Sequence, residues 1–455
     1  MDTKKLRQKI LDLAIRGKLV PQDPNDEPAS VLLERIKAEK ERLIKEGKIK
    51  KSKKSAKTSD TPHYQNVPFE IPDNWVSVPV SELFYLNPKS EIADNIHIGF
   101  IPMACVDDGF SGNHYFEKRI WKEVKKGYCH FQNGDIGIAK ISPCFENLKS
   151  TIFQGLPNNC GAGTTELVIL RPINIYAKFY LYLFKSQWYI DEGTKYFKGV
   201  VGQQRVHKGI FTDLHIPLPP LVEQQRIVTE IEKWFALIDQ IEQGKVDLQT
   251  TIKQTKSKIL DLAIHGKLVP QDPNDEPSIE LLQRINPDFT PCDNGHYTQL
   301  PDGWTVAPMQ ILCSLIDGDK QNGIERINLD VKYLRGERDA KTLTSGKYVA
   351  AKSLLILVDG ENSGEVFRTP IDGYQGSTFK QLFINKNINA EYVLQVINLH
   401  RKILRENKVG SAIPHLNKKL FKAIEVPIPP YDEQKRIVEA VNLAFKQLDV
   451  ITESL

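Results

Sequence analysis

The sequence contains few of the residues and runs that mark a secreted, membrane-bound or metal-dependent protein. It has six cysteines in 455 residues, with no C-x-x-C pair and no histidine at zinc-site spacing: Cys105, Cys129, Cys144, Cys160, Cys292 and Cys313. This pattern favours buried, reduced thiols over a disulfide framework or a structural zinc site. No apolar run approaches the roughly 20 residues of a membrane span, and the beginning, MDTKKLRQ, leads into no signal-peptide core. We therefore expect a cytoplasmic protein that does not contact a membrane.

Catalytic and nucleotide-binding motifs are missing as well. There is no Walker A sequence for ATP. An adenine methyltransferase needs Asp, Asn or Ser followed by Pro-Pro and an aromatic residue. IPPY (428–431) begins with isoleucine instead, and its counterpart LPPL (218–221) lacks the aromatic residue. Both segments are predicted to be rigid hinges, because proline fixes φ and keeps the preceding residue out of the helical region. The sequence predicts no catalytic residue, metal site or cofactor in this chain.

The charge is nearly balanced overall but uneven along the chain. There are 61 basic and 57 acidic residues, a net charge of +4, yet residues 48–57, KIKKSKKSAK, hold six lysines and no acid. Such a run is typical of a solvated linker, and it can also contact phosphate. The chain is 40% apolar and long enough for two or three domains that each bury a core.

Two long segments occur twice. KILDLAIRGKLVPQDPNDEP (9–28) recurs at 258–277 with a single difference, and IPLPPLVEQQRIVTEI (216–231) recurs as VPIPPYDEQKRIVEAV (426–441). Self-similarity of this kind indicates a tandem of two similar units, each leaving its body through a proline-rich hinge into a helix.

A shorter pair, IPDNW and LPDGW, ends in Trp75 and Trp304 and opens two bodies of dissimilar sequence. We expect these tryptophans to anchor the two cores rather than to stack on bases. Both bodies combine β-rich runs with a helix-like segment, which predicts an α+β fold. The β-rich runs are residues 134–141, 165–172, 353–358 and 380–385, and the helix-like segments are 174–187 and 389–404.

A heptad pattern follows the first hinge. From Ile227 to Leu262, nine of the eleven positions spaced by alternating four and three residues are apolar, which predicts a coiled-coil helix. The two ends of the chain repeat the two parts of this pattern, at Ile437, Val441, Ala444, Leu448, Ile451 and Leu455, and at Leu6, Ile10 and Leu13. We therefore predict a circularly permuted two-fold repeat. In it the termini lie close together and jointly form a second helix, antiparallel to the central one.

A basic loop precedes each hinge. FKGVVGQQRVHKG (197–209) and ENKVGSAIPHLNKK (406–419) occupy matching places in the two units. Arginine, glutamine and asparagine can pair with base edges, whereas lysine mostly holds phosphate. Each residue alone is equally consistent with a solvated loop, but two matching clusters favour contact with DNA. The candidates are Lys198, Gln203, Gln204, Arg205, His207, Lys208, Lys408, His415, Asn417, Lys418 and Lys419.

The repeated twenty-residue segment ends in a polar loop. Gly17 and Gly266 stand where a helix C-cap favours a left-handed residue, and the prolines that follow stop the helix. Capping does not account for the identity of the rest of the loop, because a loop that only turns the chain would drift in sequence. We favour a common partner bound by both copies over gene conversion. The predicted docking residues are Gln22, Asp23, Asn25, Asp26, Gln271, Asp272, Asn274 and Asp275.

The order of body, hinge P-x-P-P-x-x-E-Q-x-R-I-V, long helix, second body and second hinge resembles the specificity subunit of a Type I restriction–modification system. The resemblance covers nearly the whole chain. It implies a non-catalytic subunit that binds double-stranded DNA and docks two methyltransferase (M) subunits, which carry S-adenosylmethionine. Restriction (R) subunits, with ATP and magnesium, join through them.

The resemblance also points to one strand. GDIGIAKISP (134–143) is similar to the family's Gly-Asp-Ile-Leu-x-x-Arg strand, with Lys140 at the basic position as a further DNA-binding candidate. The second body departs from the pattern, because Lys352-Ser353 stands where the first has Gly134-Asp135.

We therefore expect an α+β fold with two target-recognition domains separated by a pair of long antiparallel coiled-coil helices, with pseudo-two-fold symmetry. The expected segments are an N-terminal helical segment (1–50), a basic linker (51–63), the first recognition domain (64–220), a central helical spacer (221–290), the second recognition domain (291–430) and a C-terminal helix (431–455). The two domains would bind unlike half-sites of one asymmetric, bipartite DNA site. Two other functions remain open: a self-sufficient DNA methyltransferase or nuclease, and a protein-binding adaptor with a coiled-coil spacer.

Overall fold

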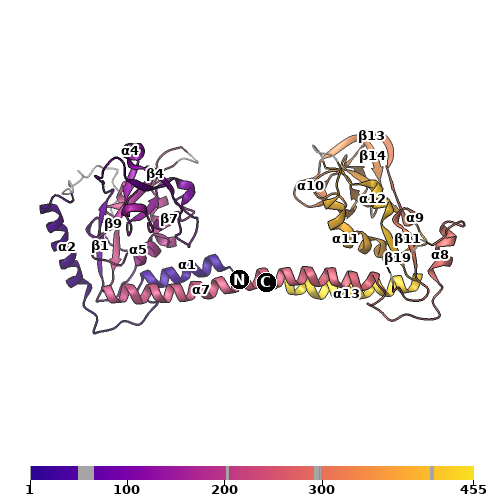
Figure 1. Ribbon diagram of the computed structural model, residues 1–455, viewed down its shortest axis with the longest axis horizontal. Coiled ribbons are helices and arrows are strands. Elements are labelled where there is room, and N and C mark those ends of the chain that lie inside the picture. The colour runs from indigo at the N-terminus through magenta and orange to yellow at the C-terminus, as the bar shows by residue number, and fades with distance from the viewer. Residues whose placement is uncertain are drawn as a thin grey trace. The chain divides into compact units, whose positions relative to one another are not determined.

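The computed structural model describes residues 2–49, 66–200, 204–291, 297, 299–409 and 414–454. The chain divides into two compact units, Met1–Gln243 (unit 1) and Gly244–Leu455 (unit 2), and the boundary falls inside one helix, α7 (Leu221–Ile264). The units correspond to the two copies of the predicted tandem, and each combines helices with sheets, which confirms the α+β prediction (Figure 1). The predicted basic linker, residues 51–63, lies outside the described residues.

In unit 1, α1 (Thr3–Ile15) lies antiparallel to the first part of α7 (Figure 1). Arg7 contacts Glu242, whereas Gln22, which follows α1, contacts Glu223 at the beginning of α7. The helix also packs against the body, where Gln8 Nε2 donates to Lys185 O at 3.0 Å. Its buried face is therefore rotated from the predicted one, in which only Ile10 was right. The buried residues are Arg7, Ile10, Leu11, Ala14 and Ile15, and Leu6 and Leu13 are half-buried.

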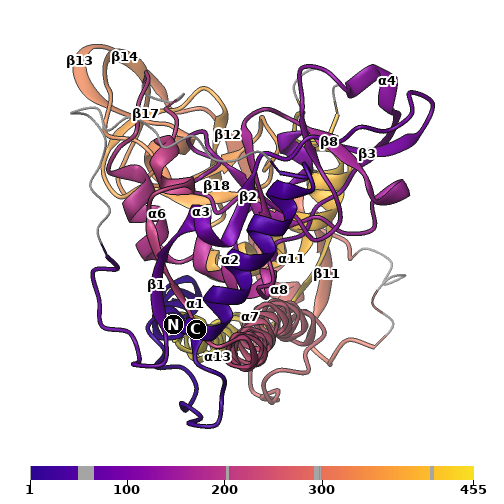
Figure 2. The ribbon, with the colours of Figure 1, turned by 90° about the vertical axis from the view of Figure 1, so that its left-hand side faces the viewer.

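The second helix, α2 (Ala29–Lys45), covers a short helix of the body, α3 (Val80–Leu83) (Figure 2). Leu32 and Ile36 are its buried side chains, and Lys40 Nζ donates to Ser81 O at 2.6 Å. Helices at both ends of the repeated loop are thus fixed to the body of unit 1.

In unit 2, the last part of α7 lies antiparallel to α13 (Tyr431–Glu453). Lys256 Nζ contacts Asp449 and lies 5.1 Å from the ring centroid of Phe445, while Gln271 contacts Glu433 at the beginning of α13. An antiparallel helix pair, as predicted, is therefore present within each unit. The predicted closeness of the chain termini compares residues of different units and stays a prediction.

The predicted apolar seam of α7 is buried only toward its two ends. Ile231, Ile238 and Ile252 are at most 6% exposed, whereas Trp234, Ile241 and Leu248 are 42%, 42% and 38% exposed. Phe235, 8% exposed, takes the place expected for Trp234. Leu248 lies between the contact of Arg7 of α1 with Glu242 and the contact of Asp449 of α13 with Lys256. The heptad positions of the predicted coiled-coil helix are therefore only partly buried along α7.

Gly244 lies in the middle of α7, and the helix continues through it. A Cβ atom added there would meet no heavy atom within 4 Å. We expect Gly244→Ala to stabilise α7 by about 0.5–1 kcal/mol, because glycine loses more backbone entropy on entering a helix. Hydrogen exchange of residues 240–250 measures the effect. Gly17→Ala is the matched control and should destabilise, since Gly17 has φ of 65° and its Cβ would lie 2.4 Å from Pro72 Cγ. Unchanged or faster exchange in Gly244→Ala would contradict the prediction.

The described residues of unit 1 form three antiparallel or mixed sheets. A two-stranded sheet closes the body beside the hinge, and two four-stranded sheets form the rest. The closing sheet is β1 (Val76–Pro79) with β10 (His215–Leu218). The first four-stranded sheet has the order β2 (Phe84–Leu86), β9 (Leu167–Pro172), β6 (Ile136–Ala139), β7 (Ser150–Ile152), and the second has the order β4 (Glu117–Ile120), β3 (His97–Ile101), β8 (Gly161–Gly163), β5 (Cys129–Phe131). The body helices are α3, α4 (Trp121–Val124), α5 (Ala177–Phe184) and α6 (Gln187–Thr194), with 3-10 turns at Met103–Cys105, Pro157–Asn159 and Lys208–Phe211.

Unit 2 repeats part of this plan. The closing sheet is β11 (Thr305–Pro308) with β19 (Glu425–Ile428), and the four-stranded sheet has the order β12 (Cys313–Ile316), β18 (Phe379–Ile384), β15 (Leu354–Leu357), β16 (Val366–Arg368). The remaining strands, β13 (Asp319–Leu329), β14 (Thr342–Val349) and β17 (Gly373–Gln375), close into a small barrel. The helices are α8 (Ser278–Ile285), α9 (Met309–Leu312), α10 (Val331–Leu334), α11 (Ala390–Glu406) and α12 (Lys418–Ala423).

The two bodies therefore share a frame and differ beyond it. In both, the closing sheet and the first four-stranded sheet have the same strand order and antiparallel pairing, and each of the four predicted β-rich runs overlaps one strand of that sheet. The rest is a second four-stranded sheet in unit 1 and the small barrel in unit 2. Low sequence identity between the bodies thus accompanies a real difference in structure.

Two smaller expectations concern the cysteines and membranes. The five described cysteines are free thiols, of which Cys160 and Cys313 are buried and the other three half-buried. Burial raises the pKa of the Cys313 thiol to about 12. Among the described residues, no helix combines the length and apolar character needed to cross a bilayer.

Candidate nucleic-acid interface

The basic loop of unit 1 lies against the end of β6. Lys198 and Arg205 exchange backbone hydrogen bonds of 3.0 and 2.8 Å, and Arg205 also pairs with Ile141, two residues beyond β6. Val206 N donates to Lys140 O at 2.9 Å. The fold thus brings together four of the predicted DNA-binding residues: Lys140, Lys198, Gln204 and Arg205. A fifth, Gln203, lies outside the described residues.

The side chain of Arg205 is held by a carboxylate. Its Nε and Nη2 atoms donate to the two oxygens of Glu166 at 3.0 and 2.8 Å. The bound guanidinium lowers the pKa of Glu166. The side chain of Arg205 nevertheless remains 50% exposed. The Glu166 carboxylate would compete with a DNA phosphate for the Arg205 guanidinium, but it also fixes the plane of that guanidinium.

The other predicted residues of this loop divide into two kinds. His207 Nδ1 accepts from Gly209 N at 3.1 Å and so caps the 3-10 turn Lys208–Phe211, which is a structural contact. Lys198 and Lys208 are exposed and form no ion pair with any residue in the described ranges. The two lysines are therefore available for phosphate, whereas His207 is used by the fold.

Unit 2 contains the equivalent arrangement. Val409 and His415 exchange backbone hydrogen bonds of 3.0 and 2.8 Å, and His415 pairs with Asp359, two residues beyond β15. His415 Nδ1 lies 2.6 Å from Oδ1 of Asp359, and the His415 side chain is 50% exposed. Arg205 and His415 therefore occupy equivalent positions beside the two sheets. Each side chain contacts one carboxylate, Glu166 in unit 1 and Asp359 in unit 2.

The remaining candidates of unit 2 have mixed roles. Lys408 donates to Glu361 at 2.8 Å, and its side chain is only 18% exposed. Asn417 Oδ1 accepts from Leu420 N at 3.1 Å and caps α12. Lys418 and Lys419 are exposed in the first turn of that helix and form no ion pair within the described part of the chain. Among the described candidates of unit 2, these two lysines and His415 are the ones exposed enough to contact a ligand.

The Gly-Asp segment of unit 1 belongs to the core. Asp135 is 1% exposed and accepts hydrogen bonds from Nε and Nη2 of Arg171, both at 2.8 Å. Unit 2 replaces both partners, with Ser353 in the place of Asp135 and Phe383 in that of Arg171. The backbone is the same, since Gly134 and Lys352 have φ of 90° and 66°. Unit 2 therefore departs from the motif by replacing both members of the ion pair, the acid and the arginine.

When the equivalent sheets of the two units are aligned, Lys140 of unit 1 has no basic counterpart in unit 2. Lys140 N donates to Glu166 O at 2.9 Å, and Val358 N donates to Thr378 O at the same distance. Val358 therefore occupies the place of Lys140 in unit 2, and it is 5% exposed. A basic contact at this position is available to unit 1 alone.

The repeated polar loops pair with the repeated hinge helices. In unit 1, Gln22 Nε2 donates to Glu223 at 2.6 Å, and Arg226 forms an ion pair with Asp26, whose side chain is 6% exposed. In unit 2, Gln271 Nε2 donates to Glu433 at 3.0 Å, and Arg436 pairs with Asp275, 9% exposed. Four of the eight predicted docking residues therefore have partners on the hinge helices. These partners give the identity of the loops a cause within the chain.

The other four docking residues stabilise the turn of each loop. Asp23 Oδ1 accepts from N and Nδ2 of Asn25 at 2.9 and 3.0 Å, and Asp272 does the same for Asn274 at 2.9 Å each. Asn25, Asp272 and Asn274 are exposed and Asp23 is half-buried. These residues remain accessible to a partner, and the predicted docking role stays a prediction for them.

The two tryptophans complete these junctions. Trp75 Nε1 donates to Glu223 at 2.9 Å and Trp304 Nε1 to Glu433 at 3.0 Å, and the side chains are 4% and 9% exposed. The prediction that they anchor the cores is confirmed. Burial raises the pKa of Glu223, and the hydrogen bonds from Trp75 and Gln22 oppose that shift. The left-handed caps are confirmed too, since Gly17 and Gly266 both have φ of 65°.

Sequence reasoning missed the two glutamates and the two arginines of the hinge as partners of the loops. The signal was present: the loop and the E-Q-x-R hinge are both duplicated, and their charges are complementary. Repeats that are conserved together within one chain can be each other's partners.

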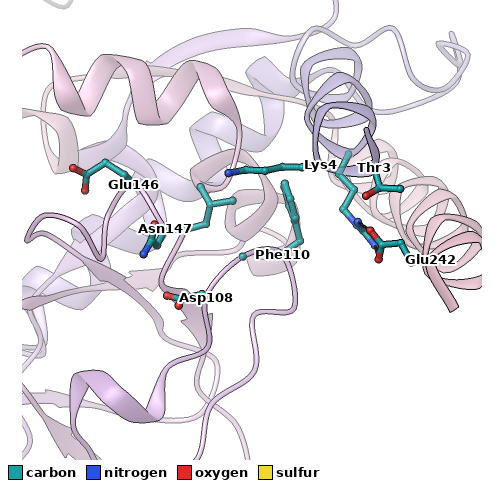
Figure 3. Close-up of a pocket in the computed structure, with 10 residues that line it drawn as sticks. Thr3, Lys4, Asp108, Phe110, Glu146, Asn147 and Glu242 are labelled. Carbon is teal, nitrogen blue, oxygen red and sulfur yellow. Dashed lines mark hydrogen bonds and ion pairs between the residues drawn. The ribbon is translucent and has the colours of Figure 1, made fainter. Parts of the chain in front are cut away.

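A groove of unit 1 is lined by the beginning of α1, by Glu242 of α7 and by residues 108–110 and 146–148 of the body (Figure 3). Its volume is about 410 Å³, and none of its lining residues is a cysteine or histidine. Within the groove, Arg7 donates a hydrogen bond to Glu242, and the guanidinium carbon of Arg7 lies 5.9 Å from the ring centroid of Phe110. Lys185 Nζ donates to Gly109 O and Leu148 O at 2.7 Å each, and burial lowers its pKa to about 7. These contacts fix the loops of the body.

Comparison with known proteins agrees with the fold. The sequence matches the family described as "Type I restriction modification DNA specificity domain" over residues 72–249 and 303–453. It is 38% identical over 419 residues to the EcoAI specificity subunit of Escherichia coli, covering 79% of this chain and 70% of that protein. It is 43% identical over 326 residues to the EcoEI specificity subunit of the same species, covering 62% and 54%.

Two solved structures have a similar fold at 16% sequence identity. One is a chain from a study of complex assembly and conformational transition of the type I R-M system, with a TM-score of 0.64 over 85% of this chain and 94% of that one. The other is the HsdS subunit from Thermoanaerobacter tengcongensis, with a TM-score of 0.52 over 85% and 93%. Together with the two matched domains and their hinge motifs, these findings establish that the chain belongs to the Type I restriction–modification DNA specificity family.

Proposed function

We propose that this chain is the DNA-recognition subunit of a Type I restriction–modification complex and that it binds an asymmetric, bipartite DNA site. One observation carries the proposal: the two units share a frame, a closing sheet and a hinge junction, but differ in the rest of their bodies. A repeated frame suits the repeated grooves of a duplex. Unlike bodies on that frame suit unlike half-sites.

The proposal includes the partners. Two methyltransferase subunits dock on equivalent surfaces of the two units, and restriction subunits join through them. S-adenosylmethionine, ATP and magnesium are bound by those partners, and this chain contributes no catalytic residue. The exposed lysines at the two bridges supply phosphate contacts, with Lys198 and Lys208 in unit 1 and Lys418 and Lys419 in unit 2.

Co-expression with a cognate adenine methyltransferase tests the proposal. The host should lack adenine methylation of its own, and methylated adenines should be mapped genome-wide. We expect one bipartite motif with two unlike halves around an unspecified gap. Methylation by the isolated chain with S-adenosylmethionine alone would favour the self-sufficient enzyme instead. The absence of both methylation and DNA binding would favour a protein-binding adaptor.

The docking loops give a second, separable test. Replacing Asp23 and Asn25 with alanine in the first copy is expected to remove one of two bound methyltransferase subunits while DNA binding by the isolated chain persists. Mass measurement of the purified complex gives the stoichiometry. The matched control is Asp272→Ala with Asn274→Ala in the second copy, which should have the same effect on the other subunit. Asp26 is left unchanged, because its loss would break the contact with Arg226. If both variants still bind two methyltransferase subunits, the loops have a structural role only and do not dock the subunits.

A further inference from the structure

Arg205 and His415 occupy the same position in two otherwise different bodies. Each lies on a short backbone bridge, opposite the second residue beyond an equivalent strand, β6 in unit 1 and β15 in unit 2. Both side chains are 50% exposed, and each is bound by one carboxylate. The position is therefore conserved in geometry within the chain, while the side chain on it changes.

The carboxylates come from different places in the sheet. Glu166 immediately precedes β9, whereas Asp359 follows β15 and is itself the bridge partner of His415. The residue that corresponds to Glu166 in unit 2 is Thr378. The two acids do not occupy equivalent positions, but each binds the polar side chain at the shared bridge position.

In unit 1, Glu166 leaves one edge of the Arg205 guanidinium open. A guanidinium has five N–H groups, and Glu166 takes the Nε–H and one Nη2–H. Within the described residues nothing accepts from Nη1. The Nη1–Nη2 edge can therefore donate two parallel hydrogen bonds, which is the arrangement that matches O6 and N7 of guanine. The fixed plane reduces the entropy lost on binding.

In unit 2, Asp359 fixes the imidazole in the corresponding way. A carboxylate only accepts, so Nδ1 of His415 carries the proton that faces Asp359. The opposite atom, Nε2, has no partner among the described residues and is an acceptor when the ring is neutral. Such an acceptor suits an exocyclic amino group, as on adenine or cytosine. The two units thus present different hydrogen-bonding groups at one shared position.

We propose that Arg205 and His415 are specificity-determining residues that contact bases, one in each half-site, and that Glu166 and Asp359 position them. Arg205 selects guanine, and His415 selects a base with an amino group in the major groove. This inference rests on the proposed function. It separates these two residues from the neighbouring lysines, which hold phosphate.

The test compares methylation motifs of variants co-expressed with the wild-type methyltransferase. Arg205→Lys keeps the charge but loses the planar fork. It should lower methylation of the original sites about tenfold or more and admit other bases at a single position of one half-site. His415→Ala should relax a single position of the other half-site. Glu166→Gln should relax the same position as Arg205→Lys to a smaller degree, without changing the other half.

Matched controls are available in each body. Arg119 forms an exposed pair with Glu117 on β4, and His400 lies on α11. Arg119→Lys and His400→Gln should leave the motif unchanged. If Arg205→Lys and His415→Ala also keep the wild-type motif, or lose methylation uniformly across all sequences, the base contacts are refuted and the residues bind phosphate or are structural. Failure of the wild-type chain to give any bipartite motif would refute the proposed function instead.

Discussion

Asp135→Ala is expected to destabilise unit 1 by about 3–5 kcal/mol, because it leaves the Arg171 guanidinium partly buried without its counter-charge. Burial raises the pKa of the Asp135 carboxyl, and the two bonds from Arg171 oppose that shift. Arg171→Phe alone should therefore be costly too, since it leaves the acid buried and unpaired. Four of the five tryptophans lie in unit 1, so denaturant unfolding followed by tryptophan fluorescence reports mainly on this unit.

The residues of unit 2 at the positions of Asp135 and Arg171 suggest a double substitution that restores stability. Asp135→Ser combined with Arg171→Phe reproduces Ser353 and Phe383, and it should recover most of the lost stability, to within about 1–2 kcal/mol of wild type. The exposed pair of Glu117 and Arg119 is the control, and Glu117→Ala should cost less than about 1 kcal/mol. If the double variant is as unstable as the sum of the two single variants, the substitutions in unit 2 are not a compensating pair.

Trp75→Ala is expected to lower the free energy of unfolding of unit 1 by about 3–5 kcal/mol, because it removes a buried side chain and leaves Glu223 without its N–H donor. The indole packs edge-on against Phe179, with ring centroids 6.3 Å apart, in addition to its bond to Glu223. Hydrogen exchange should accelerate in the first part of α7 and in the loop at residues 22–27. Trp75→Phe should cost about 1–3 kcal/mol, since it keeps most of the packing but not the N–H donor.

The matched variant in the second copy tests whether the junctions are independent. Trp304→Ala should accelerate exchange in α13 and in the loop at residues 271–276, while the first part of α7 keeps its wild-type protection. Equal loss of protection in both units from either substitution would show that the junctions do not act separately. Protection unchanged in both variants would contradict the anchoring role of the tryptophans.

The sequence predicted the arrangement that depends on local pattern. Gly17 and Gly266 adopt the left-handed conformation that the caps require, and the β-rich runs form the strands of the shared sheet, because alternation and capping are properties of neighbouring residues. The burial of Trp75 and Trp304 followed from their place at the start of two apolar bodies. The seam of α7 was less predictable. Heptad spacing is present throughout the helix, but spacing alone does not decide burial, since Ile241 and Leu248 remain 42% and 38% exposed.

By itself, then, the sequence determined that the chain is a tandem of two α+β units with hinge-bound helices, since repeats, turn residues and periodicity are written in the order of residues. Only the tertiary structure decided what the duplicated loops touch. Gln22 and Asp26 meet Glu223 and Arg226 across about 200 residues of chain, and no local pattern encodes such a distance. It also decided that Arg205 and His415 share one position, because strand pairing, not spacing along the chain, brings Glu166 and Asp359 to them.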